Sequence, residues 1–338
     1  MEADLGKRLD DLFASDFGKT YGNARAFLVV VGGQPVVERY YQQSSRDTTI
    51  NIQSAGKSIM STLIGIALDE GRLRSVDQTL FELLPPYRTA MTPAVRAITL
   101  SQLLTMTAGL PGDEGRSYPK MMDSEDWVRG ILAEGPTQPS GQFRYASAGS
   151  HLLSVILSEA TGRSVLDYAR EKLFTPLGIR TMPAAEPVAR PENLADGIAG
   201  FAWPTDPQGH HTGNGGQKLT AADMAKLGQL WLDKGKWGDR QLVSVAWMNE
   251  ATRAHTSTGS PISGAYGYQF WLTKADGHDA FAAAGYGGQL VEMVPDLDLV
   301  VVVLSRSPLD PTAPGESGTT DAGLYMELVS ALIAPAVR

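Results

Sequence analysis

A serine and a lysine three residues apart are the first residues whose types suggest catalysis. Ser54 and Lys57 lie in the segment Asn51-Ile-Gln-Ser-Ala-Gly-Lys-Ser-Ile-Met60, at the start of a predicted helix. Residues three apart share one face of a helix, with Cβ atoms about 5–6 Å apart, so the Lys57 amine can reach the Ser54 hydroxyl. A helix N-terminus also offers backbone amides, here that of Ser54, to an oxyanion. The pair fits a serine nucleophile with a lysine beside it, although this spacing also occurs by chance on many helices.

A tyrosine and a serine further along the chain supply a second element. Tyr145 and Ser147 lie in Phe143-Arg-Tyr-Ala-Ser-Ala-Gly149, before a helix that we expect to begin near Ser150. Residues two apart in an extended segment point to the same side, so both side chains can enter one pocket. A phenolate held near ammonium groups can accept a proton and return it. The two elements together predict one site containing a hydroxyl nucleophile, an amine and a phenol.

The order of these motifs resembles a known superfamily. Ser-x-x-Lys followed about ninety residues later by Tyr-x-Ser is similar to the serine β-lactamases and penicillin-binding proteins, and most similar to their class C, DD-peptidase and esterase-like branch. Four further segments resemble scaffold segments of that branch, so the likeness covers nearly the whole chain: Leu103-Leu-Thr-Met-Thr-Ala-Gly-Leu110, Ser140-Gly-Gln-Phe-Arg-Tyr145, Leu173-Phe-Thr-Pro-Leu-Gly-Ile179 and Leu219-Thr-Ala-Ala-Asp-Met-Ala-Lys-Leu-Gly228.

The resemblance implies a role for each matching residue. Ser54 would be the acylated nucleophile, and Lys57 would lower the proton affinity of its hydroxyl. Tyr145 would pass a proton to the leaving group, and Ser147 would orient Lys57 or hydrogen-bond the substrate. The implied reaction is acyl transfer through a covalent acyl-enzyme and hydrolysis by water, without a metal or an organic cofactor.

The third motif of the superfamily, Lys-Thr-Gly on an edge strand, is missing. Its expected place holds Ala280-Phe-Ala-Ala-Ala-Gly-Tyr-Gly-Gly-Gln289, which has no cation to bind a substrate carboxylate. A backbone amide of Ala283 or Ala284 could complete an oxyanion hole with the amide of Ser54, in a register that the sequence leaves open by a residue or two. The glycine-rich end of this segment resembles esterase-like and nylon-oligomer-hydrolase-like relatives.

These observations favour a serine hydrolase that acts on small carboxylic esters. On the same fold, the alternatives are an amidase of the nylon-oligomer type, a weak β-lactamase, a DD-peptidase-like enzyme and an acyltransferase. A different class of function is a non-catalytic acyl-binding sensor module. We predict that Tyr118, Tyr286 and Gly287 contact the substrate. Other aromatic side chains could line a pocket, although most of them are expected to be packing residues: Trp127, Trp203, Tyr266, Tyr268 and Trp271.

Histidines give no comparable signal. His210 and His211 are adjacent on a Gly-rich loop, but a metal site needs more ligands at suitable spacing, so no metal is predicted. His151 is predicted to be a structural helix residue. No Gly-x-Ser-x-Gly segment is present, which argues against an α/β-hydrolase nucleophile elbow.

Apolar spacing predicts the elements that carry these residues. Helices are expected at 4–17, from 54 to about 71, at 221–234 and at 322–333, and strands at 26–31, 35–41, 266–272, 280–284, 289–294 and 299–304. Tight connections make the sheet antiparallel. We therefore predict an α+β, β-lactamase-like fold, an antiparallel sheet flanked by helices with an inserted, mainly helical domain. The sheet domain would combine residues 1–76 and 213–338, the insertion would span 77–212, and 310–320 would form a surface loop.

Composition limits the partners. The chain has 338 residues, a net charge of −8 and 29 scattered Lys and Arg residues, which disfavours nucleic acid and leaves a small-molecule ester or amide as the expected partner. No apolar run approaches the roughly 18 residues of a membrane span, and the N-terminus lacks the apolar core of a secretory signal. The chain as given is thus expected to be cytoplasmic, or periplasmic or secreted if a leader was removed. The sequence contains no cysteine, so disulfides and thiolate chemistry are excluded, and the oligomeric state stays open.

Overall fold

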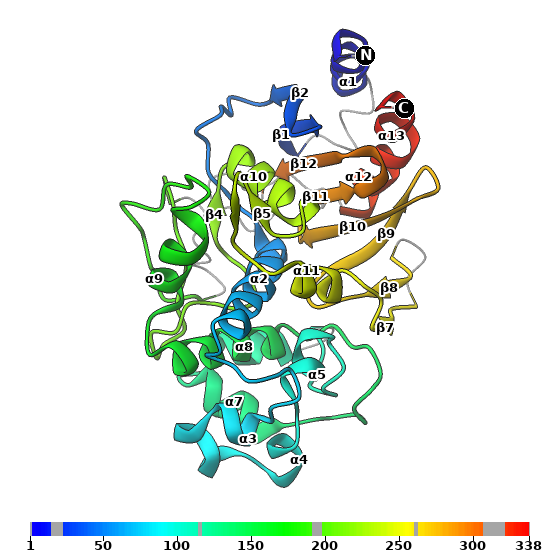
Figure 1. Cartoon of the computed structure of the whole chain (residues 1–338). Helices are drawn as coiled ribbons and strands as arrows, with labels where there is room; N and C mark the ends of the chain where they lie inside the picture. Colours follow the sequence, from blue (N-terminus) through cyan, green and yellow to red (C-terminus); the bar gives the residue numbers. More distant parts are fainter. Residues whose placement is uncertain are drawn as a thin grey trace.

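An eight-stranded antiparallel sheet forms the centre of the molecule in the computed structural model (Figure 1). The structure describes residues 2–14, 23–113, 117–190, 198–259, 263–306 and 322–337. The strand order is β2-β1-β12-β11-β10-β9-β8-β7. These strands are β1 (Ala24–Val31), β2 (Gln34–Tyr40), β7 (Thr256–Ser257), β8 (Ala265–Tyr266), β9 (Trp271–Ala275), β10 (His278–Gly285), β11 (Gln289–Val294) and β12 (Leu299–Ser305). Two short strand pairs lie outside this sheet: β3 (Ile50–Asn51) with β4 (Lys218–Leu219), and β5 (Lys236–Trp237) with β6 (Arg240–Gln241).

Both ends of the chain contribute to this sheet. The hairpin strand β1 pairs with β12 on one side and with β2 on the other, and all these pairings are antiparallel. In the register, Val29 lies opposite Val301 on β12 and opposite Val37 on β2. The predicted α+β fold with an antiparallel sheet is therefore confirmed.

Alternating side chains of the strands enter two hydrophobic cores. On β12, Val300 and Val302 belong to the core that also contains residues of the helices α2 and α10, whereas Val301 and Val303 face the core that contains residues of α1 and α12. A one-residue slip would exchange the two faces of the strand. Because burying a Val side chain contributes about 1.5–3 kcal/mol, both cores fix the register that places β10.

Local capping sets several helix starts. Thr220 caps α10 through a reciprocal capping box with Asp223, and Thr99 does the same with Gln102 at α5. Each box satisfies two amides that the first turn leaves without partners. The helices are α1 (Glu2–Ala14), α2 (Gly56–Asp69), α3 (Leu80–Leu83), α4 (Pro93–Arg96), α5 (Leu100–Leu104), α6 (Ser117–Asp123), α7 (Trp127–Glu134), α8 (Ser147–Thr161), α9 (Val165–Ala169), α10 (Ala221–Leu232), α11 (Val245–Ala251), α12 (Ala322–Leu328) and α13 (Ala334–Val337).

The middle of the chain is helical. Helices α3 to α9 all fall within residues 77–212, and in Figure 1 α3, α4 and α7 lie together at the bottom, away from the large sheet. Helix α8 packs against α2, so the helix that carries Ser147 and the helix that carries Lys57 are neighbours. The division into an insertion of 77–212 and a sheet domain of 1–76 and 213–338 stays a prediction.

Several predicted boundaries differ from the structure. Helix α8 begins at Ser147 rather than near Ser150, because Ala146 is extended and the Ser147 amide donates to the Asp113 carboxylate at 2.7 Å. The strand expected at 266–272 is split into β8 and β9, because Gln269 between them adopts a left-handed φ of 61°. The helix expected at 322–333 continues to residue 337 through a π-helical turn.

Other predictions fall partly or wholly outside the described residues. The opening helix is described over Glu2–Ala14, so its expected end at 17 lies beyond that range, as does the loop at 310–320. Among the helices of the described ranges, none combines the length and the apolarity needed to cross a bilayer.

Candidate active site

Ser54 lies in a 3₁₀ turn, Gln53–Ala55, directly before α2 rather than inside it. The turn is sharp because Gln53 adopts a left-handed φ of 51°, a region that costs a residue other than glycine about 1 kcal/mol or more. The side chain of Asn51 accepts a hydrogen bond from the Gln53 amide at 2.9 Å and supports this conformation. The short strand β3 precedes the turn and α2 follows it, so Ser54 is held from both sides.

Lys57 is buried at the start of α2, as its apolar neighbours predict, with 1% of its surface exposed. Its Nζ lies 2.8 Å from Ser54 Oγ, 3.0 Å from Ser147 Oγ and 2.9 Å from the carbonyl oxygen of Asn214. The predicted contact across one helical turn is therefore present. The contact with Ser147 joins two segments that are 90 residues apart in the sequence.

The three oxygens around Lys57 differ in whether they can donate a hydrogen bond to its amine. The Asn214 carbonyl can only accept a hydrogen bond. Ser147 Oγ donates its own hydrogen to Asp113 Oδ2 at 2.6 Å, so it also accepts from Lys57. Ser54 is the remaining partner, and its hydroxyl can donate to an amine as well as accept from an ammonium. The arrangement can therefore take a proton from Ser54 and hold the resulting ammonium with three acceptors.

The Tyr145 ring also lies close to Lys57. The Lys57 Nζ is 4.8 Å from the centroid of the Tyr145 ring, within the range of a cation–π interaction. The ring stacks on Trp271 of β9, with centroids 5.5 Å apart and an interplanar angle of 17°. The structure thus brings Ser54, Lys57, Tyr145 and Ser147 together around one amine.

Sequence reasoning missed two residues of this cluster, Asp113 and Asn214, and named Trp271 only among the aromatics that could line a pocket. Asp113 holds both the amide and the hydroxyl of Ser147, and its own amide donates to the Tyr145 carbonyl at 2.9 Å. The sequence signal that could have identified Asp113 is a carboxylate three residues after the scaffold segment that ends at Leu110. Asn214 contributes a backbone carbonyl, a group that every residue type carries, so no side-chain pattern identifies it.

Strand β10 approaches the Ser54 turn closely. A Cβ at Gly285 would lie 2.4 Å from the Ile52 carbonyl oxygen and 3.0 Å from the Ser54 amide nitrogen, so glycine permits this approach. The register with β9 ends at the pair of Ala282 and Trp271, which leaves Ala283 and Ala284 beyond it. The oxyanion role of the amides of Ala283 or Ala284 with that of Ser54 stays a prediction.

Two cavities border the cluster. A space of about 30 Å³ lies at Ser54, and its walls include Met122, Trp127 and Asn214. A larger cavity of about 410 Å³ is lined by the same Trp127 together with apolar residues such as Ile131, and Asp113 lies in its wall. Trp127 thus lines both a very small space at the nucleophile and a larger, mostly apolar one.

The three residues predicted to contact the substrate either lie away from the walls of these two cavities or have side chains outside the described part of the chain. Tyr286 is 54% exposed in the turn between β10 and β11, next to Gly287, and neither is among the residues that line these two cavities. Tyr118 belongs to α6, but its side chain is outside the described part of the chain. Contact of these three residues with substrate stays a prediction.

The histidines bind carboxylates. Asp206 Oδ2 lies 3.0 Å from both His151 Nε2 and His210 Nδ1, and His211 Nε2 lies 2.9 Å from Glu186. Burial opposes ionisation of Asp206, but the two imidazoles outweigh it and hold the pKa of this carboxyl well below its usual range. In the described ranges, no group of three or more His, Asp or Glu side chains is arranged to hold a metal ion.

Comparison with known proteins places this geometry in a family. The family described as Beta-lactamase matches residues 19–321. The 6-aminohexanoate-dimer hydrolase of Paenarthrobacter ureafaciens is 25% identical over 336 residues, covering 91% of this chain and 78% of that protein. Penicillin-binding protein 4 of Amycolatopsis lactamdurans is 28% identical over 281 residues, covering 77% and 72%. The solved structure of a family VIII carboxylesterase shares the fold with a TM-score of 0.65 and 20% identity, covering 90% of this chain and 92% of that one.

The matched region contains both sequence motifs and the residues that meet around Lys57. It spans all of the large sheet and the helical middle of the chain. This chain is a serine hydrolase that belongs to the Beta-lactamase family.

Proposed function

We propose that the protein is a carboxylesterase that hydrolyses small esters through an acyl-enzyme on Ser54. One observation carries this proposal. Of the three oxygens around the buried Lys57 amine, Asn214 O and Ser147 Oγ are fixed as acceptors, and Ser54 Oγ is left to give up a proton. A serine becomes a useful nucleophile when an adjacent base takes its proton.

Acylation would begin with transfer of the Ser54 proton to Lys57 while Oγ attacks the ester carbonyl carbon. The carbonyl π electrons move to oxygen, and the oxyanion would be held by the amides of Ser54 and of Ala283 or Ala284. When the intermediate collapses, the bond to the alcohol oxygen breaks, and Tyr145 would pass a proton from Lys57 to that oxygen. The alcohol leaves and Ser54 carries the acyl group.

Deacylation would use the same groups in reverse roles. Tyr145 would take a proton from a water and pass its own proton to Lys57, while the water oxygen attacks the acyl carbon. When the bond from that carbon to Ser54 Oγ breaks, Lys57 would return the proton to Oγ, and the carboxylic acid leaves. Throughout, Lys57 would be held by Asn214 and Ser147, so that the charged form is matched by acceptors. These steps need no group beyond the substrate and water.

Two features favour a small, uncharged ester. The segment 280–289 carries no Lys or Arg, so the position of the family's third motif offers no cation to a substrate carboxylate. The space of about 30 Å³ at Ser54 has room for only a few atoms, which suits a short acyl group. The larger cavity that Trp127 also lines would accept the apolar alcohol part.

An amide is the second candidate substrate. It is favoured by the relative described as a 6-aminohexanoate-dimer hydrolase, which is 25% identical. The same Ser54 chemistry can cleave amides and esters. An amine is a poorer leaving group than an alcohol, so amide cleavage depends more on protonation of the leaving group. A β-lactamase, a DD-peptidase-like enzyme, an acyltransferase and a non-catalytic acyl-binding sensor are the further alternatives.

The test is an assay with p-nitrophenyl acetate and butyrate, together with mass spectrometry after exposure to a fluorophosphonate. We expect steady turnover of the acetate, slower turnover of the butyrate, and one adduct on Ser54. In Ser54→Ala both turnover and adduct should be lost, with kcat lower by roughly 10³-fold or more.

The remaining alternatives give distinct results. Turnover of the linear 6-aminohexanoate dimer without ester turnover would replace the esterase by an amidase, and nitrocefin hydrolysis would indicate a β-lactamase. A stoichiometric acyl adduct without steady turnover would identify a sensor. No turnover and no adduct would refute the proposal.

A further inference from the structure

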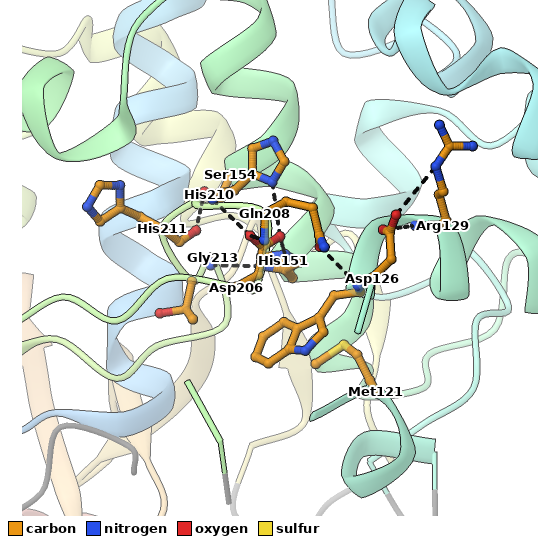
Figure 2. Close-up of polar contacts among 12 residues, drawn as sticks. Met121, Asp126, Arg129, His151, Ser154, Asp206, Gln208, His210, His211 and Gly213 are labelled. Carbon is orange, nitrogen blue, oxygen red and sulfur yellow. Dashed lines mark hydrogen bonds and ion pairs between the residues drawn. The ribbon is translucent and has the colours of Figure 1, made fainter. Parts of the chain in front are cut away.

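A buried carboxylate joins two histidines behind the catalytic cluster. Asp206 is fully buried, and its Oδ2 lies 3.0 Å from His151 Nε2 and 3.0 Å from His210 Nδ1. Its Oδ1 accepts from the amides of Gln208 and His210 at 2.9 and 2.8 Å. Figure 2 draws these contacts as dashed lines. None of these residues contacts Ser54 or Lys57, so the reaction described above does not use them directly.

The network determines which nitrogen of His151 carries a hydrogen. His151 Nδ1 lies 3.5 Å from the Gly213 amide, and an amide can only donate, so Nδ1 must accept. The hydrogen of the neutral ring is then on Nε2 and is donated to Asp206. Asp206 thus fixes the tautomer in which His151 can hold Gly213.

The segment 211–216 is clamped against α8 at this point. Ser154 Oγ donates to the carbonyl oxygen of His211 at 2.5 Å (Figure 2). A Cβ at Gly213 would lie 2.2 Å from the Ser150 carbonyl oxygen, so the backbone of the segment touches that of the helix. Residues 211–213 are therefore held to α8 by two hydrogen bonds, from Ser154 to the His211 carbonyl and from the Gly213 amide to His151, and by the backbone contact at Gly213.

The same segment reaches the catalytic residues within three more positions. The Asn214 carbonyl accepts from Lys57 Nζ at 2.9 Å. A Cβ at Gly215 would lie 2.1 Å from the Gln53 carbonyl oxygen, so the backbone at Gly215 passes directly over the Ser54 turn. Asn214 and Gly215 also line the small space at Ser54.

Helix α8 consequently holds Lys57 by two routes. Ser147 contacts Lys57 directly, and His151, one turn later on the same face, acts through Gly213 and Asn214. Loosening the second route would move the Asn214 carbonyl away from Lys57 and widen the small space.

We propose that Asp206 is a positioning residue for ester hydrolysis, because it holds His151 and His210 so that the segment 211–216 presents the Asn214 carbonyl to Lys57. This inference rests on the proposed function. It assigns the side chains of His151 and His210 a role in shaping the site.

Asp206→Asn tests the idea with little change in volume. Oδ1 of the new amide would stay with the two backbone amides, so its NH₂ group would face two ring nitrogens that now donate. His151 would have to move its hydrogen to Nδ1, which then opposes the Gly213 amide. Because a misplacement of about 1 Å can cost about 10²-fold in rate, we expect kcat for p-nitrophenyl acetate to fall about tenfold or more while KM changes less than about threefold.

Glu186→Gln is the matched control. It also replaces a carboxylate that binds a histidine of this segment, at 2.9 Å from His211 Nε2. In the described residues the other ring nitrogen of His211 has no hydrogen-bond partner, so a change of tautomer there disturbs no contact. Its kcat and KM should match the wild type.

The rate of fluorophosphonate labelling separates this inference from the proposed function. If the wild type is labelled on Ser54 without ester turnover, the esterase proposal fails, and slower labelling of Asp206→Asn still supports the positioning role. If the wild type turns over and Asp206→Asn has an unchanged kcat and labelling rate, the positioning role is overturned. A wild type that neither turns over nor is labelled refutes both.

A second variant covers the case in which Asp206→Asn does not fold. Ser154→Ala removes the hydrogen bond to the His211 carbonyl and leaves the Asp206 network in place. We expect kcat to fall about three- to tenfold with a nearly unchanged KM, since one of several tethers is lost. A wild-type kcat in this variant would then overturn the inference.

Discussion

Asp113 makes two hydrogen bonds to Ser147, one through each carboxylate oxygen. Oδ1 accepts from the Ser147 amide at 2.7 Å and so satisfies the first amide of α8, and Oδ2 accepts from the Ser147 hydroxyl at 2.6 Å. The second bond commits Ser147 as an acceptor toward Lys57. One residue therefore fixes a helix start and the direction of a hydrogen bond at the nucleophile.

Asp113→Asn should separate these two effects. The amide oxygen can keep the bond to the Ser147 backbone, but the NH₂ group would donate to Ser147 Oγ and turn its hydrogen toward Lys57. We expect kcat to fall about 10- to 100-fold with a small change in Tm, measured with p-nitrophenyl acetate and by thermal unfolding.

Asp126→Asn provides the control for this substitution. Asp126 accepts from the Arg129 amide at 2.9 Å at the start of α7, and Asn caps a helix equally well. Its activity should match the wild type. An Asp113→Asn protein with wild-type kcat would show that the orientation of the Ser147 hydroxyl does not matter.

Strand β10 and the turn that carries Ser54 are in direct contact, and this contact is possible because Gly285 has no side chain. Gly285 has no positive φ, so its need for glycine is steric: an added Cβ would meet the Ile52 carbonyl at 2.4 Å. The strand is anchored by its pairing with β11, in which Gly285 lies opposite Gln289. The part of β10 beyond its pairing with β9 is therefore held beside the Ser54 turn, where we predict that an amide of Ala283 or Ala284 binds the oxyanion.

Gly285→Ala should push the turn and the strand apart. We expect kcat to fall about 100-fold or more, because oxyanion donors act only at short range, and fluorophosphonate labelling to slow in parallel. Gly264→Ala is the control, since nothing lies within 4 Å of an added Cβ there. Unchanged kinetics in Gly285→Ala would contradict an oxyanion site between β10 and Ser54.

The sheet that connects both ends of the chain contains one buried acid away from the active site. Glu292 on β11 is fully buried, and Thr273 donates to its Oε1 at 2.7 Å. Burial raises the pKa of Glu292 to about 8, only partly opposed by the Thr273 hydrogen bond. The folded protein therefore binds a proton here that the unfolded chain releases above its ordinary pKa of 4.5.

This difference sets the sign of a pH effect on stability. Between pH 4.5 and about 8 the folded state holds more protons at Glu292, so the free energy of unfolding falls as pH rises, and the loss levels off above about 8. Glu292→Gln should remove this loss and raise stability by on the order of a few kcal/mol at pH 8, but little at pH 4.5. Urea unfolding between pH 4.5 and 9 measures it.

Glu250→Gln should behave in the opposite way. A hydrogen bond from Arg253 lowers the pKa of Glu250, so its carboxylate supports the folded state above the ordinary pKa and that support is lost as pH falls. Replacing it should slightly lower stability at neutral pH. Equal pH profiles for the wild type and Glu292→Gln would refute the assignment of Glu292 as a buried, protonated acid.

Local geometry explains which features could be predicted from the amino-acid order. The contact of Ser54 with Lys57 depends on a spacing of three residues across a helical turn, and the two faces of strands such as β12 follow from alternation. Both are properties of short segments, so the sequence predicted the antiparallel sheet from both termini and the meeting of the two motifs. The boundaries at Ser147 and within 266–272 were wrong because a distant carboxylate and a single left-handed residue set them.

The remaining parts of the site depend on contacts between distant segments. The Asn214 carbonyl meets Lys57 across 157 residues, and Gly285 approaches the Ser54 turn from the far end of the chain. Backbone carbonyls and missing side chains leave no residue-type pattern, so folding alone brings them to the nucleophile. The sequence specified a serine, a lysine and a tyrosine in the right order. Three-dimensional packing decided which groups around Lys57 donate a hydrogen bond and which accept one.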